Sequence, residues 1–285
     1  MLMKIAWIGT GVMGNPMARH LQSAGYNVSA YNRTFEKAKE LEPLIKACHT
    51  IEECVNEADV IFSIVGYPKD VKEVYDEVFK HAKKSAILVD MTTSSPTLAK
   101  DLFIKAKSLG LHMIDAPVTG GDVGAINATL SIMAGGNHDV YQTILPLLQL
   151  MGKTITYMGE AGNGQHAKLA NQVVIAGNIA AIAESLLYAK SKDLNLDSML
   201  NVITGGSASS WQAQINGRKM INHDYAPGFF IKHFLKDLKL VMEEKQGLEL
   251  EVVERVVRIF ETLNEKGYSE NGTQAIIEYY LQKMA

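Results

Sequence analysis

The 285-residue chain has few of the residues that hold small secreted or metal-binding proteins together. Its two cysteines, Cys48 and Cys54, are too few for a disulfide framework, so we expect reduced thiols packed inside a cytoplasmic protein. Its eight histidines show neither an HxxxH pattern nor cysteine partners at metal-binding spacing. These absences exclude a disulfide-stapled fold and predict that the protein holds no metal.

The chain also has little net charge and no long uninterrupted apolar run. With 28 Lys and Arg against 31 Asp and Glu, it has no basic excess to attract nucleic acid or an anionic membrane surface. The N-terminal MLMKIAWIGTG is a short apolar run broken by glycine, with no cleavage site after it, unlike a signal peptide. Asn178, Glu184 and Ser185 interrupt the most apolar stretch, Val173–Ala189, which therefore predicts a buried helix rather than a membrane span.

Short β-rich runs alternate with amphipathic segments over the first half of the chain. Each run is apolar and bounded by turn residues, whereas the segments between the runs show helical spacing. The expected strands are Lys4–Ile8, Asn27–Tyr31, Val60–Val65, Ala86–Asp90, His112–Asp115, Thr129–Ala134 and Thr154–Tyr157. The expected helices are Met13–Ala24, Phe35–Glu42, Lys69–Lys83, Pro96–Leu109 and Asp139–Met151. This alternation predicts an α/β fold with a doubly wound parallel sheet and helices on both faces.

The second half of the chain shows helical patterns only. The expected helices are Gly164–Lys192, Asp197–Thr204, Ser210–Ile221, Phe234–Gln246, Glu251–Lys266 and Thr273–Lys283. The change of pattern falls near Gly159–Gly164, where the sequence EAGNG has turn chemistry. We therefore expect a nucleotide-binding domain over residues 1–162 and an all-helical domain over residues 163–285.

The first expected strand runs directly into GTGVMG, residues 9–14, and then into a helix. The first glycine permits a tight turn, the second lets backbone amides approach a pyrophosphate, and the third lets the helix pack closely on the strand. A glycine-rich turn without a ligand is the alternative, but strand, loop, helix and second strand follow in the order of a Rossmann fold. The predicted cofactor contacts are Gly9, Thr10, Gly11, Val12, Met13 and Gly14.

The second expected strand ends at Asn32, Arg33 and Thr34, where NAD-preferring proteins carry an acidic residue for the ribose 2′-hydroxyl. The Arg33 guanidinium can instead pair with a 2′-phosphate and stack on adenine, and Asn32 and Thr34 add donors. The alternative is that Thr34 merely caps the next helix and Arg33 is solvated, which leaves the missing acid unexplained. The sequence therefore favours NADP over NAD.

Four motifs in order resemble those of the β-hydroxyacid dehydrogenase family, which includes 3-hydroxyisobutyrate dehydrogenase and several semialdehyde reductases. The glycine loop reads IGTGVMGNPMARHL (Ile8–Leu21), and DAPVTGG (Asp115–Gly121) corresponds to the family's DAPVSGG. GNGQHAKLANQ (Gly162–Gln172) matches GxGxxxKxxN, and KDL (Lys236–Leu238) comes last. The resemblance covers nearly the whole chain and implies an NAD(P)-dependent oxidoreductase acting on a short 3-hydroxy acid or semialdehyde.

Lys168 lies near the start of a long, otherwise apolar expected helix, and alone it predicts a side chain that extends to water. Asn171 and Gln172 follow on the same helical face and form a polar strip with it. The resemblance makes Lys168 the general acid and base, because a lysine desolvated beside a cationic ring has a lowered pKa and can pass a proton. It also makes Asn171 the residue that holds the substrate hydroxyl or the lysine, and Gln172 a substrate-binding residue.

Thr119, Gly120 and Gly121 form a small-residue segment whose backbone amides can bind a substrate carboxylate, although a plain strand-to-loop turn is the alternative. The family usually has Ser where this chain has Thr119, so we expect the extra methyl group to narrow the pocket and shift substrate choice. The resemblance implies further contacts, to cofactor from Val65, Gly66 and Thr93, and to both cofactor and substrate from Lys236.

Three other classes fit parts of this pattern. A decarboxylating 6-phosphogluconate-type enzyme shares the early motifs but needs a longer helical domain. Imine reductases share the two-domain plan but tend to replace the lysine that is retained here. A non-catalytic cofactor-binding protein would not need the catalytic lysine, which is present here as Lys168. The small-residue face of the long helix (Ala176, Gly177, Ala180, Ala181) suggests a homodimer or homotetramer, with a small carboxylate as the other expected partner.

Overall fold

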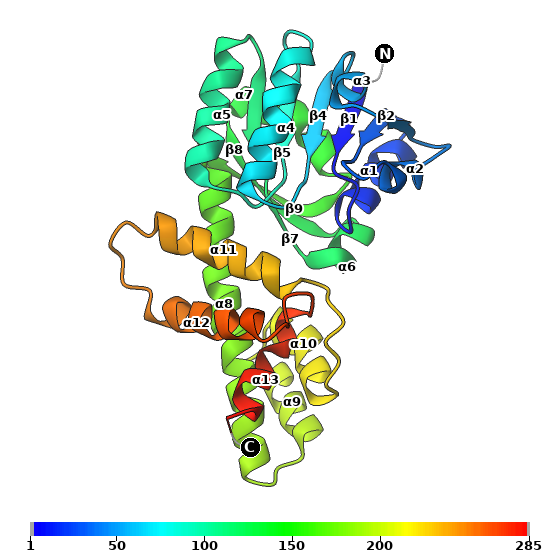
Figure 1. Cartoon of the computed structure of the whole chain (residues 1–285). Helices are drawn as coiled ribbons and strands as arrows, with labels where there is room; N and C mark the ends of the chain where they lie inside the picture. The colour runs from blue at the N-terminus through cyan, green and yellow to red at the C-terminus, as the bar shows by residue number, and fades with distance from the viewer. Residues whose placement is uncertain (1–2, 284–285) are drawn as a thin grey trace. The chain divides into compact units, whose positions relative to one another are not determined.

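The computed structural model describes residues 3–283, which form two compact units. The first unit ends at Lys168 and the second begins at Leu169, within the long helix α8 (Asn163–Ser191). Figure 1 shows the strands and their covering helices in the first unit and helices alone in the second. The domain limits expected from the sequence, 1–162 and 163–285, stay a prediction.

The first unit contains one nine-stranded sheet in the order β3-β2-β1-β4-β5-β6-β8-β7, with β9 paired to β8. The strands from β1 to β6 are all parallel, and their order is that of a Rossmann fold. The strand bounds are β1 Lys4–Ile8, β2 Asn27–Tyr31, β3 Lys46–Cys48, β4 Val60–Ser63, β5 Ile87–Asp90, β6 His112–Asp115, β7 Val118–Thr119, β8 Leu130–Gly136 and β9 Gly152–Gly159. The chain reverses its winding between β1 and β4, the place where such sheets bind ligands.

The far end of the sheet is mixed rather than parallel. β8 runs antiparallel to both β6 and β7, and β9 runs parallel to β8. The parallel arrangement expected for the sheet does not extend to this end, where the link from β6 to β8 holds β7 and a short helix, α6 (Gly121–Ile126). That link contains no long crossover helix, the usual connection between neighbouring parallel strands, and its strand β7 pairs antiparallel with β8.

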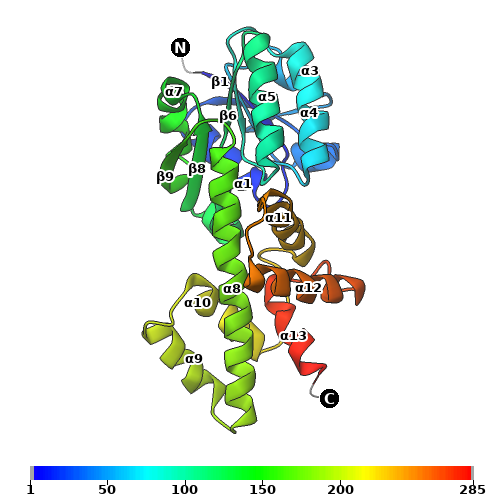
Figure 2. The ribbon, with the colours of Figure 1, turned by 90° about the vertical axis from the view of Figure 1, so that its left-hand side faces the viewer.

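Helices cover both faces of this sheet, as the alternating pattern predicted. Figure 2 shows α7 on one side and α3, α4 and α5 on the other. In β1, Trp7 joins α1, α6 and α7 in one apolar core, while its neighbour Ile8 joins α3, α4 and α5 in another. The helix bounds are α1 Gly14–Ser23, α2 Phe35–Lys39, α3 Ile51–Val55, α4 Pro68–His81, α5 Pro96–Ser108 and α7 His138–Leu148. The expected fold class is confirmed in this unit.

Two short elements between β2 and β4, the strand β3 and the helix α3, are absent from the sequence-based expectation. β3 carries Cys48 and α3 carries Cys54, and both are free and buried, as expected of packing residues. The hydroxyl of Thr50 caps α3 by accepting from the backbone amide of Glu53 at 3.1 Å. The T-x-x-E pattern at Thr50–Glu53 is a capping-box signal that could have located this helix.

The second unit is helical, with one isolated β-bridge between Phe230 and Gly272 among its described residues. Its apolar core gathers side chains from α8 and every helix after it. The later bounds are α9 Leu196–Gly205, α10 Trp211–Ile221, α11 Ile231–Glu244, α12 Glu251–Glu265, the 3₁₀ turn η1 Thr273–Ala275, and α13 Ile276–Leu281. The last expected helix is therefore divided into a 3₁₀ turn and a short α-helix.

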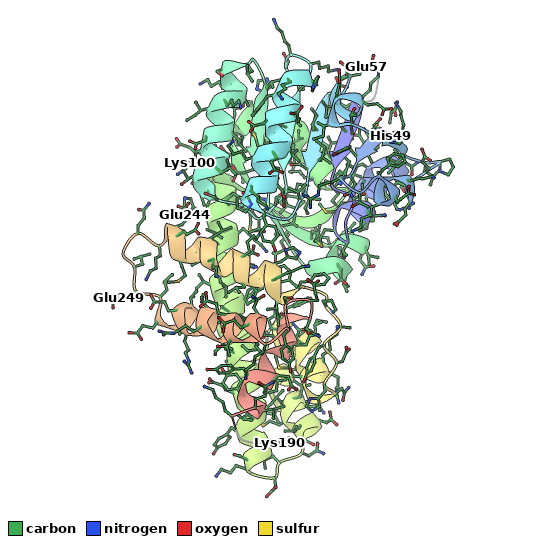
Figure 3. The ribbon with its side chains drawn as sticks, viewed as in Figure 1. His49, Glu57, Lys100, Lys190, Glu244 and Glu249 are labelled. Carbon is green, nitrogen blue, oxygen red and sulfur yellow. The ribbon has the colours of Figure 1, made fainter. Side chains whose placement is uncertain are left out.

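Helix α8 satisfies the length and hydropathy criteria for a membrane span, the one helix among residues 3–283 that does. Within its most apolar window, 44% of the residues are buried inside the protein. A core helix of a soluble protein meets the same criteria, so this feature carries no conclusion about a membrane. Charged residues such as Lys190, near the end of α8, are exposed at the surface of their unit (Figure 3).

Candidate active site

The glycine loop between β1 and α1 has geometry that only glycine accommodates at two of its three positions. Gly9 has a φ of +96°, and a Cβ there would overlap the carbonyl oxygen of Ile64 in the neighbouring strand-end loop. A Cβ on Gly14 would overlap the carbonyl oxygen of Gly9, so α1 starts directly against the loop. Gly11 is exposed, and a Cβ there would meet nothing within 4 Å. The space beside Gly11 is therefore open to a phosphate group.

The side chain of Thr10 gives a second reason to expect a dinucleotide at this loop. Thr10 is 3% exposed, and its hydroxyl has no hydrogen-bond partner among the described residues. The backbone amide of Thr10 donates to Oδ1 of Asn32 at 3.0 Å, while Nδ2 of Asn32 donates to the carbonyl of Thr34 at 2.9 Å. Asn32 therefore ties the glycine loop to the end of β2, at the carboxyl edge of the sheet.

Arg33 and Thr34 lie beside this junction and are both exposed. The Arg33 side chain is 83% exposed, and its Nη1 lies 3.3 Å from Oδ1 of Asp70 at the start of α4. Thr34 occupies the N-cap position of α2, but its hydroxyl makes no capping hydrogen bond. The alternative that the Thr34 hydroxyl caps the next helix is therefore not supported by this structure.

A buried polar network joins the loops that follow β4 and β5. The Ser63 hydroxyl donates to Oδ1 of Asp90 at 3.0 Å and contacts the Tyr75 hydroxyl at 2.9 Å. Asp90 also accepts from the Thr92 amide at 3.1 Å, and the Thr92 hydroxyl accepts from the Val65 amide at 2.9 Å. Burial raises the pKa of Asp90 to about 6, against the lowering effect of these donors. Val65, with Gly66 next to it, is therefore fixed relative to the segment that carries Thr93.

The segment Thr119–Gly121 is not a simple turn. Thr119 ends the short strand β7 and pairs in register with Ser131 of β8. Gly120 and Gly121 have φ values of +133° and +65° and lead into α6. A Cβ on Gly120 would lie 3.2 Å from the Leu130 side chain, which explains glycine at that position.

The predicted polar strip on α8 is buried. Lys168 is 6% exposed, so the expectation that its side chain extends to water was wrong. Asn171 donates to the side chain of Gln172 at 3.0 Å, and Gln172 donates to Asp237 of α11 at 2.7 Å. The Lys236 ammonium lies 2.9 Å from the other Asp237 oxygen. The structure therefore brings Asn171, Gln172 and Lys236 together around one buried carboxylate.

The predicted residues thus form two groups. The first unit holds the glycine loop, Asn32, Arg33, Thr34, Val65, Gly66 and Thr93, all at the carboxyl ends of β1, β2, β4 and β5, and it also holds Thr119, Gly120 and Gly121 at the junction of β7 and α6. The second unit holds Asn171, Gln172 and Lys236. Lys168 belongs to the same helix as Asn171 and Gln172 and is the last residue of the first unit. No group of three or more metal-ligating side chains occurs in residues 3–283.

Two family models match nearly the whole chain. Residues 4–159 match the NAD-binding domain of 6-phosphogluconate dehydrogenase, and residues 162–280 match the NAD-binding domain of NADP-dependent 3-hydroxyisobutyrate dehydrogenase. This chain belongs to the β-hydroxyacid dehydrogenase family. It is accordingly an NAD(P)-dependent oxidoreductase of the 3-hydroxyisobutyrate dehydrogenase type.

Individual family members resemble it along almost their full length. It is 40% identical to an uncharacterized oxidoreductase of Bacillus subtilis, covering 98% of this chain and 99% of that one. It is 34% identical to 2-hydroxy-3-oxopropionate reductase of Escherichia coli, covering 97% and 96%. Among solved structures, Mycobacterium tuberculosis 3-hydroxyisobutyrate dehydrogenase with L-serine is 30% identical with a TM-score of 0.89, covering 98% and 99%. Psf3 in complex with NADP⁺ and 2-OPP is 25% identical with a TM-score of 0.90, covering 96% and 99%.

Imine reductases share the fold at a greater distance. One from a Pseudomonas species is 16% identical with a TM-score of 0.67, over 98% of this chain and 100% of that one. Such a likeness shows a common architecture and carries no statement about the reaction.

The sequence reasoning missed two buried side chains inside the family's motifs, Asp115 and Gln165. Asp115 begins DAPVTGG, yet its carboxylate accepts from the backbone amides of Gly162 and Gln165 at 2.8 and 2.9 Å. Gln165, in GNGQHAK, contacts the segment around Thr93 through its side-chain amide. The signal available was their position: an acid at a strand end and an amide in the first turn of a helix, both in otherwise small-residue segments.

Proposed function

We propose that this β-hydroxyacid dehydrogenase interconverts a short 3-hydroxy acid and its semialdehyde. When bound, the nicotinamide accepts or supplies the hydride at the β-carbon of the substrate. The observation that carries the proposal is Lys168, a buried lysine followed along one helix face by Asn171 and Gln172.

Lys168 is the proposed general acid and base. During oxidation its amine takes the proton from the substrate hydroxyl, and during reduction its ammonium returns a proton to the same oxygen. A flexible side chain with a compact charge suits this transfer better than a guanidinium, which stays protonated. Asn171 orients the substrate hydroxyl or the Lys168 amine from one helical turn away.

The substrate carboxylate is proposed to bind at Thr119, Gly120 and Gly121, with Lys236 as a second cation for the anionic ligands. The two glycines have positive φ angles and carry no side chains of their own to cover their backbone amides, which suits them to bind an anion. Lys236 is paired to Asp237, a buried carboxylate that also accepts from Gln172. The pair supports a fixed ammonium rather than a mobile surface charge.

NADP is the proposed cofactor over NAD. Support comes from the exposed Arg33 at the end of β2 and from the absence of an acid among Asn32, Arg33 and Thr34. The solved relative Psf3 holds NADP⁺, which agrees with this choice without deciding it.

Steady-state kinetics with NADPH and NADH test the reaction and the cofactor together. The substrate panel comprises glyoxylate, succinic semialdehyde and tartronate semialdehyde for reduction, 3-hydroxyisobutyrate for oxidation, and a cyclic imine. We expect turnover of tartronate semialdehyde or 3-hydroxyisobutyrate, the two members of the panel that react at the β-carbon, and a kcat/KM at least about tenfold higher with NADPH. Turnover of the imine alone, or of nothing in the panel, would contradict the proposal.

A homodimer or homotetramer remains our proposal for the assembly. Ala176 and Ala180 are buried in the core of the second unit, whereas Ala181 is exposed on α8. Val174 and Tyr188, both exposed, lie on the same side of the helix as Ala181 and extend an apolar stripe. Light scattering on the purified protein measures the assembly, and a monomer at micromolar concentration would contradict it.

A further inference from the structure

Gln165, the third residue of α8, is fully buried and uses both ends of its side-chain amide. Its Nε2 donates to the carbonyl oxygen of Thr92 at 2.7 Å, and its Oε1 accepts from the backbone amide of Ser94 at 2.9 Å. These two backbone groups flank Thr93. The amide therefore holds the predicted cofactor-contacting segment by the peptide groups on either side of it.

The backbone of Gln165 is held as firmly as its side chain. Its amide donates to Oδ2 of Asp115 at 2.9 Å, while Gly162 donates to Oδ1 of the same carboxylate at 2.8 Å. Burial raises the pKa of Asp115 to about 6, so at neutral pH the group is an anion at the positive end of α8. The first turn of α8 is therefore anchored to the end of β6.

Close packing leaves this turn no room to shift. A Cβ on Gly164 would lie 2.6 Å from the Asp115 carbonyl oxygen and 2.7 Å from its carboxylate. A Cβ on Gly162 would lie 2.9 Å from the side chain of Lys100, which projects from α5 (Figure 3). The fixed turn ends where Lys168 follows Gln165 on the same side of the helix.

We propose that Gln165 is a positioning residue, which sets the Thr93 segment and the helical turn of Lys168 at a fixed separation. The inference rests on the proposed roles of Lys168 and Thr93. Both ends of the Gln165 amide are engaged by backbone groups, so it acts through the groups it holds rather than by touching the reactants. At neutral pH a side-chain amide offers one donor and one acceptor at this spacing without a charge, whereas an ionised carboxylate of the same length has no donor.

The first test replaces Gln165 with methionine, which has similar volume but makes neither hydrogen bond. We expect Gln165→Met to lower kcat by about 10²-fold, since small misplacements of catalytic groups have effects of that size. The dissociation constant for NADPH, measured by fluorescence titration, should stay within about threefold of the wild-type value.

Gln274→Met is the matched control. Gln274 is also buried, and its Nε2 donates to the carbonyl oxygens of Asp224 and Ala226, both at 3.0 Å, within the second unit. This variant loses the same kind of backbone contacts and should lower the melting temperature, while its kcat stays within about twofold of wild type.

The second test uses Gln165→Glu and pH. A protonated glutamic acid has one O–H donor and one carbonyl acceptor and can replace the amide, whereas an ionised one cannot donate to Thr92. The ratio of kcat for this variant to kcat for wild type should therefore rise at least about tenfold between about pH 8 and pH 5.5. A role in folding alone would leave that ratio flat in the folded protein.

The outcomes separate this inference from the proposed function. A wild-type protein that turns over no member of the panel overturns both. An active wild type together with an active Gln165→Met overturns the positioning role alone. A loss in Gln165→Met that Gln274→Met reproduces at an equal drop in melting temperature also overturns it, as does a pH-independent ratio for Gln165→Glu.

Discussion

Arg33 is the residue on which the proposed preference for NADP over NAD depends most directly. Replacing Arg33 with alanine removes the guanidinium from the end of β2 and should lower kcat/KM for NADPH about 10- to 100-fold. The value for NADH should change by less than about twofold, because NADH has no 2′-phosphate. Initial-rate kinetics with each cofactor at saturating aldehyde measure both numbers.

Arg218→Ala provides the control for that substitution. Arg218 is also an exposed arginine in an ion pair, with Asp197, but it lies in α10 of the second unit. It should leave both kcat/KM values near wild type. Equal losses with NADPH and NADH in Arg33→Ala would show that this arginine does not read the 2′-phosphate.

The residues of the candidate site differ in how far the sequence reveals them. The glycine loop and Arg33 stand in local patterns whose chemistry can be predicted from their neighbours in the chain, whereas the role of Lys168 was predicted from the family resemblance. Asp115 and Gln165 find their partners 47 to 73 residues away, so their contacts appear only once the strands are assembled. Their polar character was visible in the sequence, but their partners were not.

Among the secondary-structure elements, the first turn of α8 has the least tolerance for an added atom. Gly164→Ala places a methyl group against the carbonyl of Met133 and both the carbonyl and carboxylate of Asp115. We expect the free energy of unfolding to fall by about 3 kcal/mol, as for overpacking in a core. Urea unfolding of the purified variant measures this change.

A second glycine in the same helix supplies the comparison. A Cβ on Gly177 would meet only the Val252 side chain, at 3.9 Å. Gly177→Ala should therefore raise the free energy of unfolding by about 0.5 kcal/mol, since alanine is the better helix former. Equal effects at the two positions would mean that the contact of Asp115 with α8 is not tightly packed.

Elements that form an apolar run between turn residues, or that show helical spacing, were predictable, and several short elements without such a pattern were not. The expected strand Lys4–Ile8 and helix Pro96–Leu109 correspond closely to β1 and α5. In contrast, β3, β7, α3 and α6 have between two and six residues each and were not predicted, because none of them shows a clear apolar run or helical spacing. The antiparallel direction of β8 goes with its pairing to β7, a strand of two residues that the sequence pattern does not show.

For the molecule as a whole, two buried carboxyl groups should make stability depend on pH. Burial raises the pKa of Asp90 and of Asp115 to about 6, above the value of about 3.9 in an unfolded chain. Between those values the folded state binds more protons, so the free energy of unfolding falls as pH rises toward 7. Each group should contribute on the order of 1 kcal/mol between pH 5 and pH 7.

Asp90→Asn isolates one of these contributions. The amide oxygen can still accept from Ser63 and Thr92, but the group no longer titrates. The free energy of unfolding of the variant minus that of wild type should therefore be about 1 kcal/mol larger at pH 7 than at pH 5. The comparison cancels the opposite contribution of His233, whose pKa burial lowers. A stability difference that does not change with pH would contradict the assignment.

The central claim is that Lys168 passes the proton, and a single-turnover experiment on Lys168→Ala tests it most directly. The control is Lys190→Ala, an exposed lysine on the same helix. Stopped-flow absorbance follows the oxidation of bound NADPH after mixing with the aldehyde that wild type reduces best. We predict a rate about 10³-fold below wild type for Lys168→Ala, with NADPH affinity within about twofold and Lys190→Ala unchanged. A Lys168→Ala rate close to that of wild type would contradict the account.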